Sequence, residues 1–234
     1  MINVEICCNS TASAMAAKEG GANRIELCRD LECGGLTPSD EDIRFCVQNL
    51  GLRTHVLVRP RSGNFYYNAD EMGEIIATIE RCRKFGAAAV VVGFLDYDAC
   101  IDAKLTRWAV EAAGPMEVTF HRAFDEARQD PLEALEIIAS CGCNRLLTSG
   151  QHPTIVEGAE VIKRLVDASS RLCFQGRQFT ILAGGGVTPS NARELIMHTN
   201  ATELHGSCKT TLPSGIIQTD PTQVRALLQS VSGL

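Results

Sequence analysis

Eight short apolar segments recur along the chain, each followed by a polar or glycine-rich cluster and most then by a segment of helical periodicity. This alternation is typical of parallel strands joined by helices, and eight repeats predict a (β/α)8 TIM barrel, an α/β fold. We find no linker, so we expect a single domain over residues 1–234. The expected strands cover residues 4–6, 24–27, 55–58, 89–92, 117–120, 145–147, 179–183 and 203–205.

The segments between these strands carry helix signals. Apolar residues recur at a spacing of three to four from Met72 to Phe85 and stop at Gly86, which predicts an amphipathic helix. Asp130 before Pro131 predicts a capped helix start. We expect further helices after Ser10 and over residues 155–166, 190–197 and 221–231, whereas residues 169–178 lack a pattern and predict a surface loop.

One short sequence occurs twice in similar form. Gly-Gly-Leu-Thr-Pro-Ser at residues 34–39 resembles Gly-Gly-Val-Thr-Pro-Ser at residues 185–190, and both follow a predicted strand. Shared turn chemistry explains so short a match more simply than a duplicated half-barrel.

Composition narrows the class of protein. The formal net charge is −6 and the basic residues are scattered, so we expect no nucleic-acid partner. Residues 1–8 lack the features of a secretory signal, and the eleven cysteines are therefore expected to be reduced thiols in a cytoplasmic protein. No apolar stretch has the length of a membrane span, so we expect no membrane partner.

The first two strands share a Glu-x-Cys pattern. Because strand side chains alternate, Glu5 and Cys7 lie on one face, as do Glu26 and Cys28. With matched registers, the two carboxylates would lie side by side as acid–base candidates, and the two thiols just beyond them could hold Cu(I). The alternative is that the cysteines only pack and the glutamates pair with arginines.

Polar residues also follow the third and fifth strands. Arg59 and Arg61 are predicted to point to one side, where they bind an anion or pair with the two glutamates. His121 is a candidate general acid or base that titrates near neutrality, or else a satisfied core histidine. Asp125 is expected to orient His121 or Arg122, the third candidate anion-binding arginine.

The last three strands end in small and glycine-rich turns. Glycine turns after the seventh and eighth strands are the usual phosphate cradle of this fold, although a triple glycine also suits a tight turn. No lysine ends strands four to seven, which argues against a Schiff-base aldolase, and Lys209 is only a weak candidate. The substrate- or anion-binding candidates here are Thr148, Ser149, Gly184, Gly185, Gly186, His205 and Ser207.

Short segments across almost the whole chain form a recognisable set. They are Val-Glu-Ile-Cys at 4–7, Gly-Gly-Ala-Asn-Arg-Ile-Glu-Leu-Cys at 20–28, the glycine turn at 34–39, Arg-Pro-Arg at 59–61, Phe-His-Arg-Ala-Phe-Asp at 120–125, Leu-Leu-Thr-Ser-Gly at 146–150, Ile-Leu-Ala-Gly-Gly-Gly-Val at 181–187 and Glu-Leu-His at 203–205. Together these segments resemble the CutC family. The resemblance implies a cytosolic barrel, often a homo-oligomer such as a dimer, and copper binding with Cys7 and Cys28 as candidate ligands.

Two functions stay open at this point. The first is a Cu(I)-binding protein of copper homeostasis. The second is an enzyme that acts on a small phosphorylated or carboxylated metabolite by acid–base chemistry. Both place the working residues at the C-terminal ends of the barrel strands.

Overall fold

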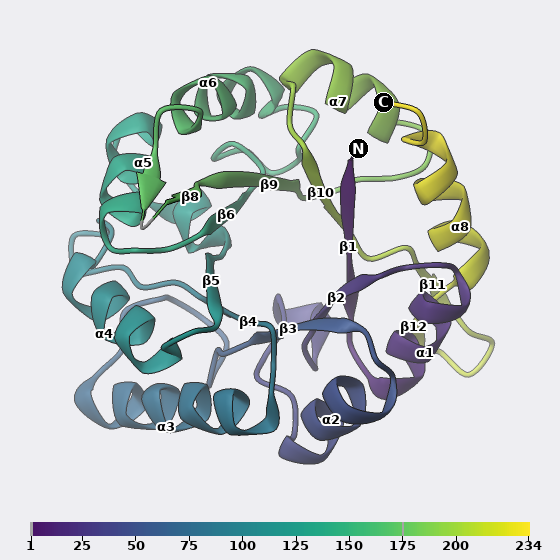
Figure 1. Ribbon diagram of the computed structural model, residues 1–234, viewed down its shortest axis with the longest axis horizontal. Coiled ribbons are helices and arrows are strands. Elements are labelled where there is room, and N and C mark those ends of the chain that lie inside the picture. The colour runs from purple at the N-terminus through teal and green to yellow at the C-terminus, as the bar shows by residue number, and fades with distance from the viewer. Residues whose placement is uncertain (1, 175) are drawn as a thin grey trace.

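Eight parallel strands close into a barrel in the computed structural model, which describes residues 2–174 and 176–234 (Figure 1). The strand order around the ring is β1-β10-β9-β6-β5-β4-β3-β2, so the first and last barrel strands pair with each other. The predicted (β/α)8 fold is confirmed. The barrel strands are β1 (Asn3–Cys8), β2 (Arg24–Leu27), β3 (Arg53–Leu57), β4 (Ala89–Val92), β5 (Glu117–Phe120), β6 (Arg145–Thr148), β9 (Thr180–Gly184) and β10 (Glu203–Gly206).

Helices surround the ring of strands on its outside (Figure 1). The predicted helix signals act as expected: Ser10 and Asp130 cap their helices, and Gly86 ends another with a φ of 89°. The helices are α1 (Thr11–Glu19), α2 (Asp40–Arg44), α3 (Ala69–Phe85), α4 (Ala103–Ala113), α5 (Pro131–Ser140), α6 (Ala159–Ser169), α7 (Ala192–Thr199) and α8 (Pro221–Ser230).

Two predictions outside the barrel need correction. The segment over residues 169–178, predicted as a loop, contains the short strands β7 (Cys173–Phe174) and β8 (Arg177–Gln178), which pair as a hairpin. The helix predicted over residues 155–166 begins only at Ala159, as α6. Ile155 lies fully buried in the loop before it, and its N–H donates to the carbonyl of Gly185 rather than within a helix. A further hairpin joins β11 (Lys209–Thr211) to β12 (Ile217–Thr219).

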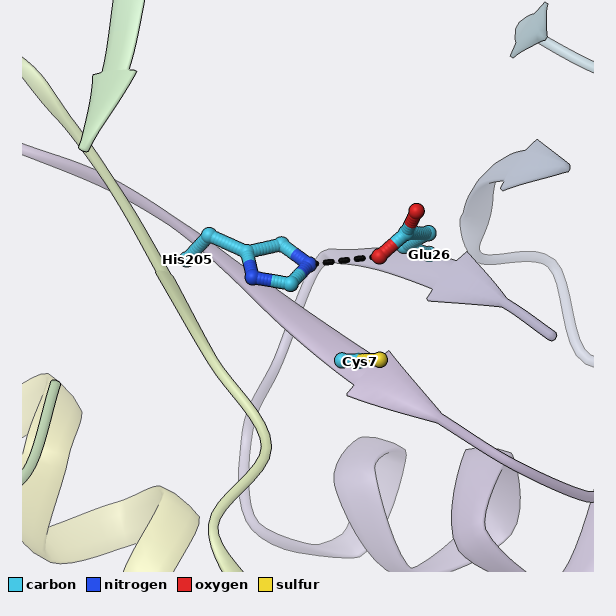
Figure 2. Close-up of side chains that lie close together, drawn as sticks. All are labelled: Cys7, Glu26 and His205. Atoms are coloured by element: carbon cyan, nitrogen blue, oxygen red, sulfur yellow. Dashed lines mark hydrogen bonds and ion pairs between the residues drawn. The ribbon is translucent and has the colours of Figure 1, made fainter. Parts of the chain in front are cut away.

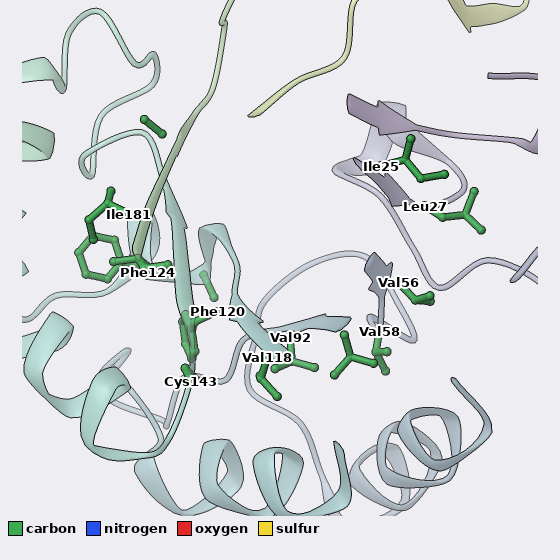
Figure 3. Close-up of a cluster of buried hydrophobic side chains, with 14 of the residues drawn as sticks. Ile25, Leu27, Val56, Val58, Val92, Val118, Phe120, Phe124, Cys143 and Ile181 are labelled. Carbon is green, nitrogen blue, oxygen red and sulfur yellow. The ribbon is translucent and has the colours of Figure 1, made fainter. Parts of the chain in front are cut away.

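The main core lies between the strands and the helices. Alternate residues of each strand point outward into this core, and these outward positions are apolar (Figure 3). Examples are Ile25, Leu27, Val56, Val118 and Phe120, all buried.

The inside of the barrel is more polar than its outside. Near the N-terminal ends of the strands, Arg24 Nε lies 2.9 Å and His55 Nδ1 2.7 Å from the Glu5 carboxylate. Arg24 and Arg145 both donate to Glu203, at 2.7 and 2.6 Å. Buried charges of both signs therefore neutralise one another at this end.

Within residues 2–174 and 176–234, every helix is too short or too polar to cross a bilayer.

Candidate functional site

A pocket of about 310 Å³ opens at the C-terminal ends of the barrel strands. This is the end at which barrels of this type carry their active sites. Its lining combines thiols, imidazoles, cationic side chains, glycines and an apolar wall: Cys7, Glu26, Cys28, Leu31, Gly34, Leu57, Arg59, Phe65, His121, Arg122, Leu147, Gly185, Gly186, Val187, His205, Gly206, Ser207 and Lys209.

Two thiols lie together at the inner end of this pocket. The sulfurs of Cys7 and Cys28 are 3.8 Å apart, and both residues are buried inside the barrel with Leu57 and Val91. Their hydrogen bond and their burial raise the pKa of Cys7 well above its usual range. We expected the two thiols to meet if the registers of β1 and β2 matched; they meet although Cys7 pairs with Glu26 rather than with Cys28. Cys8, the next residue, instead faces the outer core.

Glu26 and His205 form a largely buried ion pair beside Cys7 (Figure 2). The His205 Nε2 lies 2.6 Å from the Glu26 carboxylate. Burial opposes the imidazolium charge, but Glu26 outweighs it and raises the pKa of His205 well above its ordinary value. His205 is therefore the protonated partner of Glu26 at neutral pH.

Three chemically different donors meet at this point. A sulfur of Cys7, a carboxylate oxygen of Glu26 and a ring nitrogen of His205 all lie within 4.8 Å of one another (Figure 2). They come from β1, β2 and β10, which are neighbours in the barrel. Such a cluster suits either a metal ion or a proton-transfer step.

The matched register that would bring the two carboxylates side by side is not the one that β1 and β2 adopt. Glu5 pairs with Arg24, and Cys7 pairs with Glu26, so the two carboxylates do not lie side by side. Glu5 lies deeper in the barrel, fully buried and outside the pocket lining. Burial works to raise the pKa of Glu5, but His55 and Arg24 outweigh it and hold that pKa well below its usual range. Its place favours a structural ion pair over the predicted catalytic role.

His121 lines the pocket but differs from the general acid or base that was expected. Its Nδ1 accepts a hydrogen bond from the backbone N–H of Ala123, which leaves the proton of the neutral ring on Nε2. Burial and the nearby Arg59 lower the pKa of His121 to about 3. The ring is therefore neutral at pH 7 and offers Nε2–H as a hydrogen-bond donor.

Arg59 and Arg61 separate, contrary to the prediction that both face one side. Arg59 lines the pocket and donates to the carbonyls of Cys33, Gly35 and Gly63, so the surrounding loops hold it in place. Arg61 turns away and forms a 2.5 Å contact with Glu71 at the start of α3. Neither arginine pairs with Glu5 or Glu26, and Arg61 does not line the pocket.

Asp125 organises the turns after β5 and β6. It accepts from the Arg122 Nε at 2.7 Å and from the Thr148 hydroxyl at 2.5 Å. The N–H groups of Ser149 and Gln151 donate to the same carboxylate, while the Arg122 Nη2 also donates to Ser149. Asp125 thus orients Arg122 rather than His121. Thr148 and Ser149 are fully buried behind the pocket rather than in its lining.

The glycine turn after β9 divides into two parts. Gly184 lies outside the lining, where a Cβ would come within 2.7 Å of Leu147, so this glycine makes room for packing. Gly185 and Gly186 line the pocket, each with a φ of 98°. Gly34 and Gly35 in the related turn have φ values of 87° and 85°, as shared turn chemistry predicts.

Some pocket residues carried no sequence signal strong enough to place them there. Leu31 and Phe65 form part of an apolar wall, and Lys209 reaches the pocket from the first position of β11. Phe65 packs against both arginine and imidazole, with the Arg59 guanidinium and the His121 ring each 4.9 Å from its centroid. Only the position of Lys209 after the eighth barrel strand could have suggested its place.

Comparisons with known proteins agree with this architecture. The sequence model of the CutC family matches residues 2–210. A protein named CutC from Chromobacterium violaceum is 42% identical over 206 residues, which cover 88% of this chain and 81% of the relative. One from Photobacterium profundum is 36% identical and covers 93% of this chain and 86% of its own.

Solved structures resemble this chain either in both sequence and fold or in fold alone. A candidate copper homeostasis protein CutC from Streptococcus agalactiae superposes with a TM-score of 0.82 at 30% identity, covering 88% of this chain and 99% of the other. Phosphoribosyl anthranilate isomerase from Thermococcus kodakaraensis reaches a TM-score of 0.63 at 15% identity over 100% of both chains. The second likeness shows the fold alone.

Proposed function

This chain belongs to the CutC family, and we propose that it binds Cu(I) as its cargo in copper homeostasis, through the thiolates of Cys7 and Cys28. The observation that carries this proposal is the 3.8 Å separation of the two sulfurs at the inner end of the pocket.

The donor set fits a soft metal ion. A metal–thiolate bond is about 2.3 Å long, so two thiolates on one ion lie at most about 4.6 Å apart. The separation of 3.8 Å satisfies this limit without movement of the backbone. Thiolates select Cu(I) over the harder divalent ions, and imidazole is compatible with copper.

His205 is the natural third ligand, since it lies with Cys7 in the donor cluster. Glu26 holds its ring, as carboxylates commonly do for histidines that bind metals. Cys7 and the His205 imidazolium both carry a proton before binding, because both pKa values are raised, so uptake of Cu(I) must displace a proton from each of them. We therefore expect the affinity for Cu(I) to increase with pH.

The direct test is a Cu(I) competition titration against a chromophoric chelator under anaerobic, reducing conditions. The wild type should hold one Cu(I) tightly, and Cys7→Ser or Cys28→Ser should each weaken it by at least about 100-fold, or about 2.7 kcal/mol. Cys100→Ser/Cys173→Ser is the matched control, since neither thiol lies in the pocket lining. Weak binding that a Cys7→Ser/Cys28→Ser variant shares with the wild type would refute the proposal.

A second candidate function is acid–base chemistry on a small anionic metabolite. It is favoured by the pairing of Glu26 with His205 in a pocket that also presents His121 Nε2–H. The thiol double variant separates the two functions, because proton transfer by His205 requires neither sulfur whereas tight Cu(I) binding requires both.

A further inference from the structure

The outer part of the pocket has a different chemistry from the thiol end. Three cationic side chains line the pocket as a whole, Arg59, Arg122 and Lys209, against the single carboxylate of Glu26, and Arg122 and Lys209 lie on elements other than those of the two thiols. The chain as a whole carries a net charge of −6, so this concentration of positive charge is opposite in sign to the rest of the protein. A cleft of this kind attracts anions.

Three residues that line the pocket have backbone N–H groups without an acceptor among the described residues. Among the residues that the structure describes, none accepts a hydrogen bond from the N–H groups of Gly185, Gly186 or Ser207. The three residues follow β9 and β10, which are adjacent in the barrel. Positive φ angles at both glycines allow the chain to turn there without a side chain over the backbone. Clustered N–H groups of this kind form anion-binding concavities.

Arg122 is positioned to complete this set. A Cβ built on Gly185 would lie 3.6 Å from the Arg122 Nη1, so the guanidinium lies against the glycine turn. Asp125 and Ser149 occupy its Nε and Nη2, whereas Nη1 donates to no described residue. Lys209 is exposed at the pocket edge, and no carboxylate of the described residues lies within 4 Å of its ammonium group.

We infer that this part of the pocket binds the phosphate group of a small organic phosphate monoester. The organic part would extend from His205, which pairs with Gly184 next to the glycine turn, toward the apolar Leu31, Leu57 and Phe65, which an inorganic ion would not need. The volume of about 310 Å³ lies at the lower end of the roughly 300–1,000 Å³ of small-molecule sites. This inference is independent of copper binding and supplies a substrate class for the second candidate function. The phosphate contacts are the N–H groups of Gly185, Gly186 and Ser207 with the side chains of Arg122 and Lys209.

The test is an NMR titration of the 15N-labelled, full-length protein with ribose 5-phosphate, ribose and inorganic phosphate as probes. Ribose 5-phosphate should shift the amide signals of Gly185, Gly186 and Ser207 and saturate them below about 1 mM, or about −4 kcal/mol. Ribose should leave these signals unchanged, and inorganic phosphate should bind at least about tenfold more weakly.

Variants check the charged contact. Lys209→Gln should weaken ribose 5-phosphate binding by about three- to tenfold, and added salt should reduce the difference. Lys104→Gln is the matched control, since that lysine is exposed on α4 outside the pocket lining. Both substitutions are at exposed positions, so we expect both variants to fold.

Three results would overturn the inference: unchanged amide signals with ribose 5-phosphate, equally tight binding of inorganic phosphate, or equal affinities in Lys209→Gln and Lys104→Gln. The Cu(I) titration and the ribose 5-phosphate titration are separate measurements on the wild type, so failure of this inference and failure of the copper proposal are distinguished directly.

Discussion

Two histidines in one pocket show how neighbours determine the chemistry of a residue. His121 and His205 are both largely buried, and burial alone would lower the pKa of each. His205 lies against the carboxylate of Glu26 and becomes a stable cation, whereas His121 lies near the cationic Arg59 and stays neutral. The pocket therefore holds one positive ring and one neutral donor at pH 7.

The neutral state of His121 predicts a specific pH dependence of stability. Its folded pKa of about 3 lies below the unfolded value near 6.5, so between these values the unfolded chain binds a proton that the folded protein does not. Stability is thus lost as the pH falls from about 6.5 toward 3. His121→Asn should remove this contribution, which amounts to about 2 kcal/mol between pH 7 and pH 5.

The contribution of His121 is measured by urea unfolding of the wild type and of His121→Asn at pH 7 and pH 5. Other titrating groups affect both proteins equally, so they cancel in the difference between the two free energies of unfolding. Asparagine retains an acceptor for the Ala123 N–H. His152→Asn, at an exposed loop position, is the control and should show no comparable change. A wild-type advantage that is the same at pH 5 and pH 7 would contradict the prediction.

At the scale of elements, the carboxylate of Asp125 links the loop after β5 to the loop after β6 by hydrogen bonds. Asp125 belongs to the short 3-10 helix η3 (Arg122–Glu126) that follows β5, and its partners outside η3 are Thr148, the last residue of β6, and the residues just after it. The backbone N–H of Gln151, a residue with a φ of 58°, is one of them. The carboxylate therefore compensates a strained turn and aims Arg122 at the pocket.

Asp125→Asn should lower the free energy of unfolding by about 2–4 kcal/mol, because the new amide group faces donors that need an acceptor. It should also weaken ribose 5-phosphate binding, since Arg122 loses its fixed partner. Chemical denaturation and the NMR titration measure the two effects. Asp167→Asn, exposed on α6, is the control, and a loss of stability no larger than in that variant would show that Asp125 has no such role.

At the scale of the whole molecule, the two ends of the barrel interior have different roles. The N-terminal end contains the ion pairs of Glu203 with Arg24 and Arg145, which tie β10 to β2 and β6. The C-terminal end contains the pocket. Stability and ligand chemistry are thus separated along the barrel axis, which is typical of this fold.

Glu203→Gln tests this separation. Loss of the carboxylate leaves two buried guanidinium groups without full compensation, so the free energy of unfolding should fall by about 3–5 kcal/mol. The affinity of the folded protein for Cu(I) should be unchanged, because the thiols lie at the other end. Urea unfolding and the Cu(I) titration measure both, with the exposed Glu136→Gln as control. A large loss of copper affinity with little loss of stability would argue that the ends are not separate.

The location of much of the site was predictable, because its residues lie at the C-terminal ends of strands that can be recognised in the sequence. The order of the elements predicted that Arg59, His121 and His205 lie at the C-terminal ends of the strands, and all three line the pocket there. Strand alternation put Glu5 with Cys7 and Glu26 with Cys28 on one face each, but the meeting of the two thiols depended on a register that the sequence did not specify. These predictions needed only the local period of a strand and the order of the elements, both of which are written in short stretches of sequence.

The sequence by itself therefore determined the barrel, most helix boundaries and the end of the barrel at which polar side chains gather around the pocket. Only the tertiary structure decided that Cys7 rather than Glu5 pairs with Glu26, that Arg61 turns to Glu71, and that His121 stays neutral. The physical reason is that strand stagger is a property of the closed ring as a whole, while burial and charge at each residue depend on groups far away in the chain.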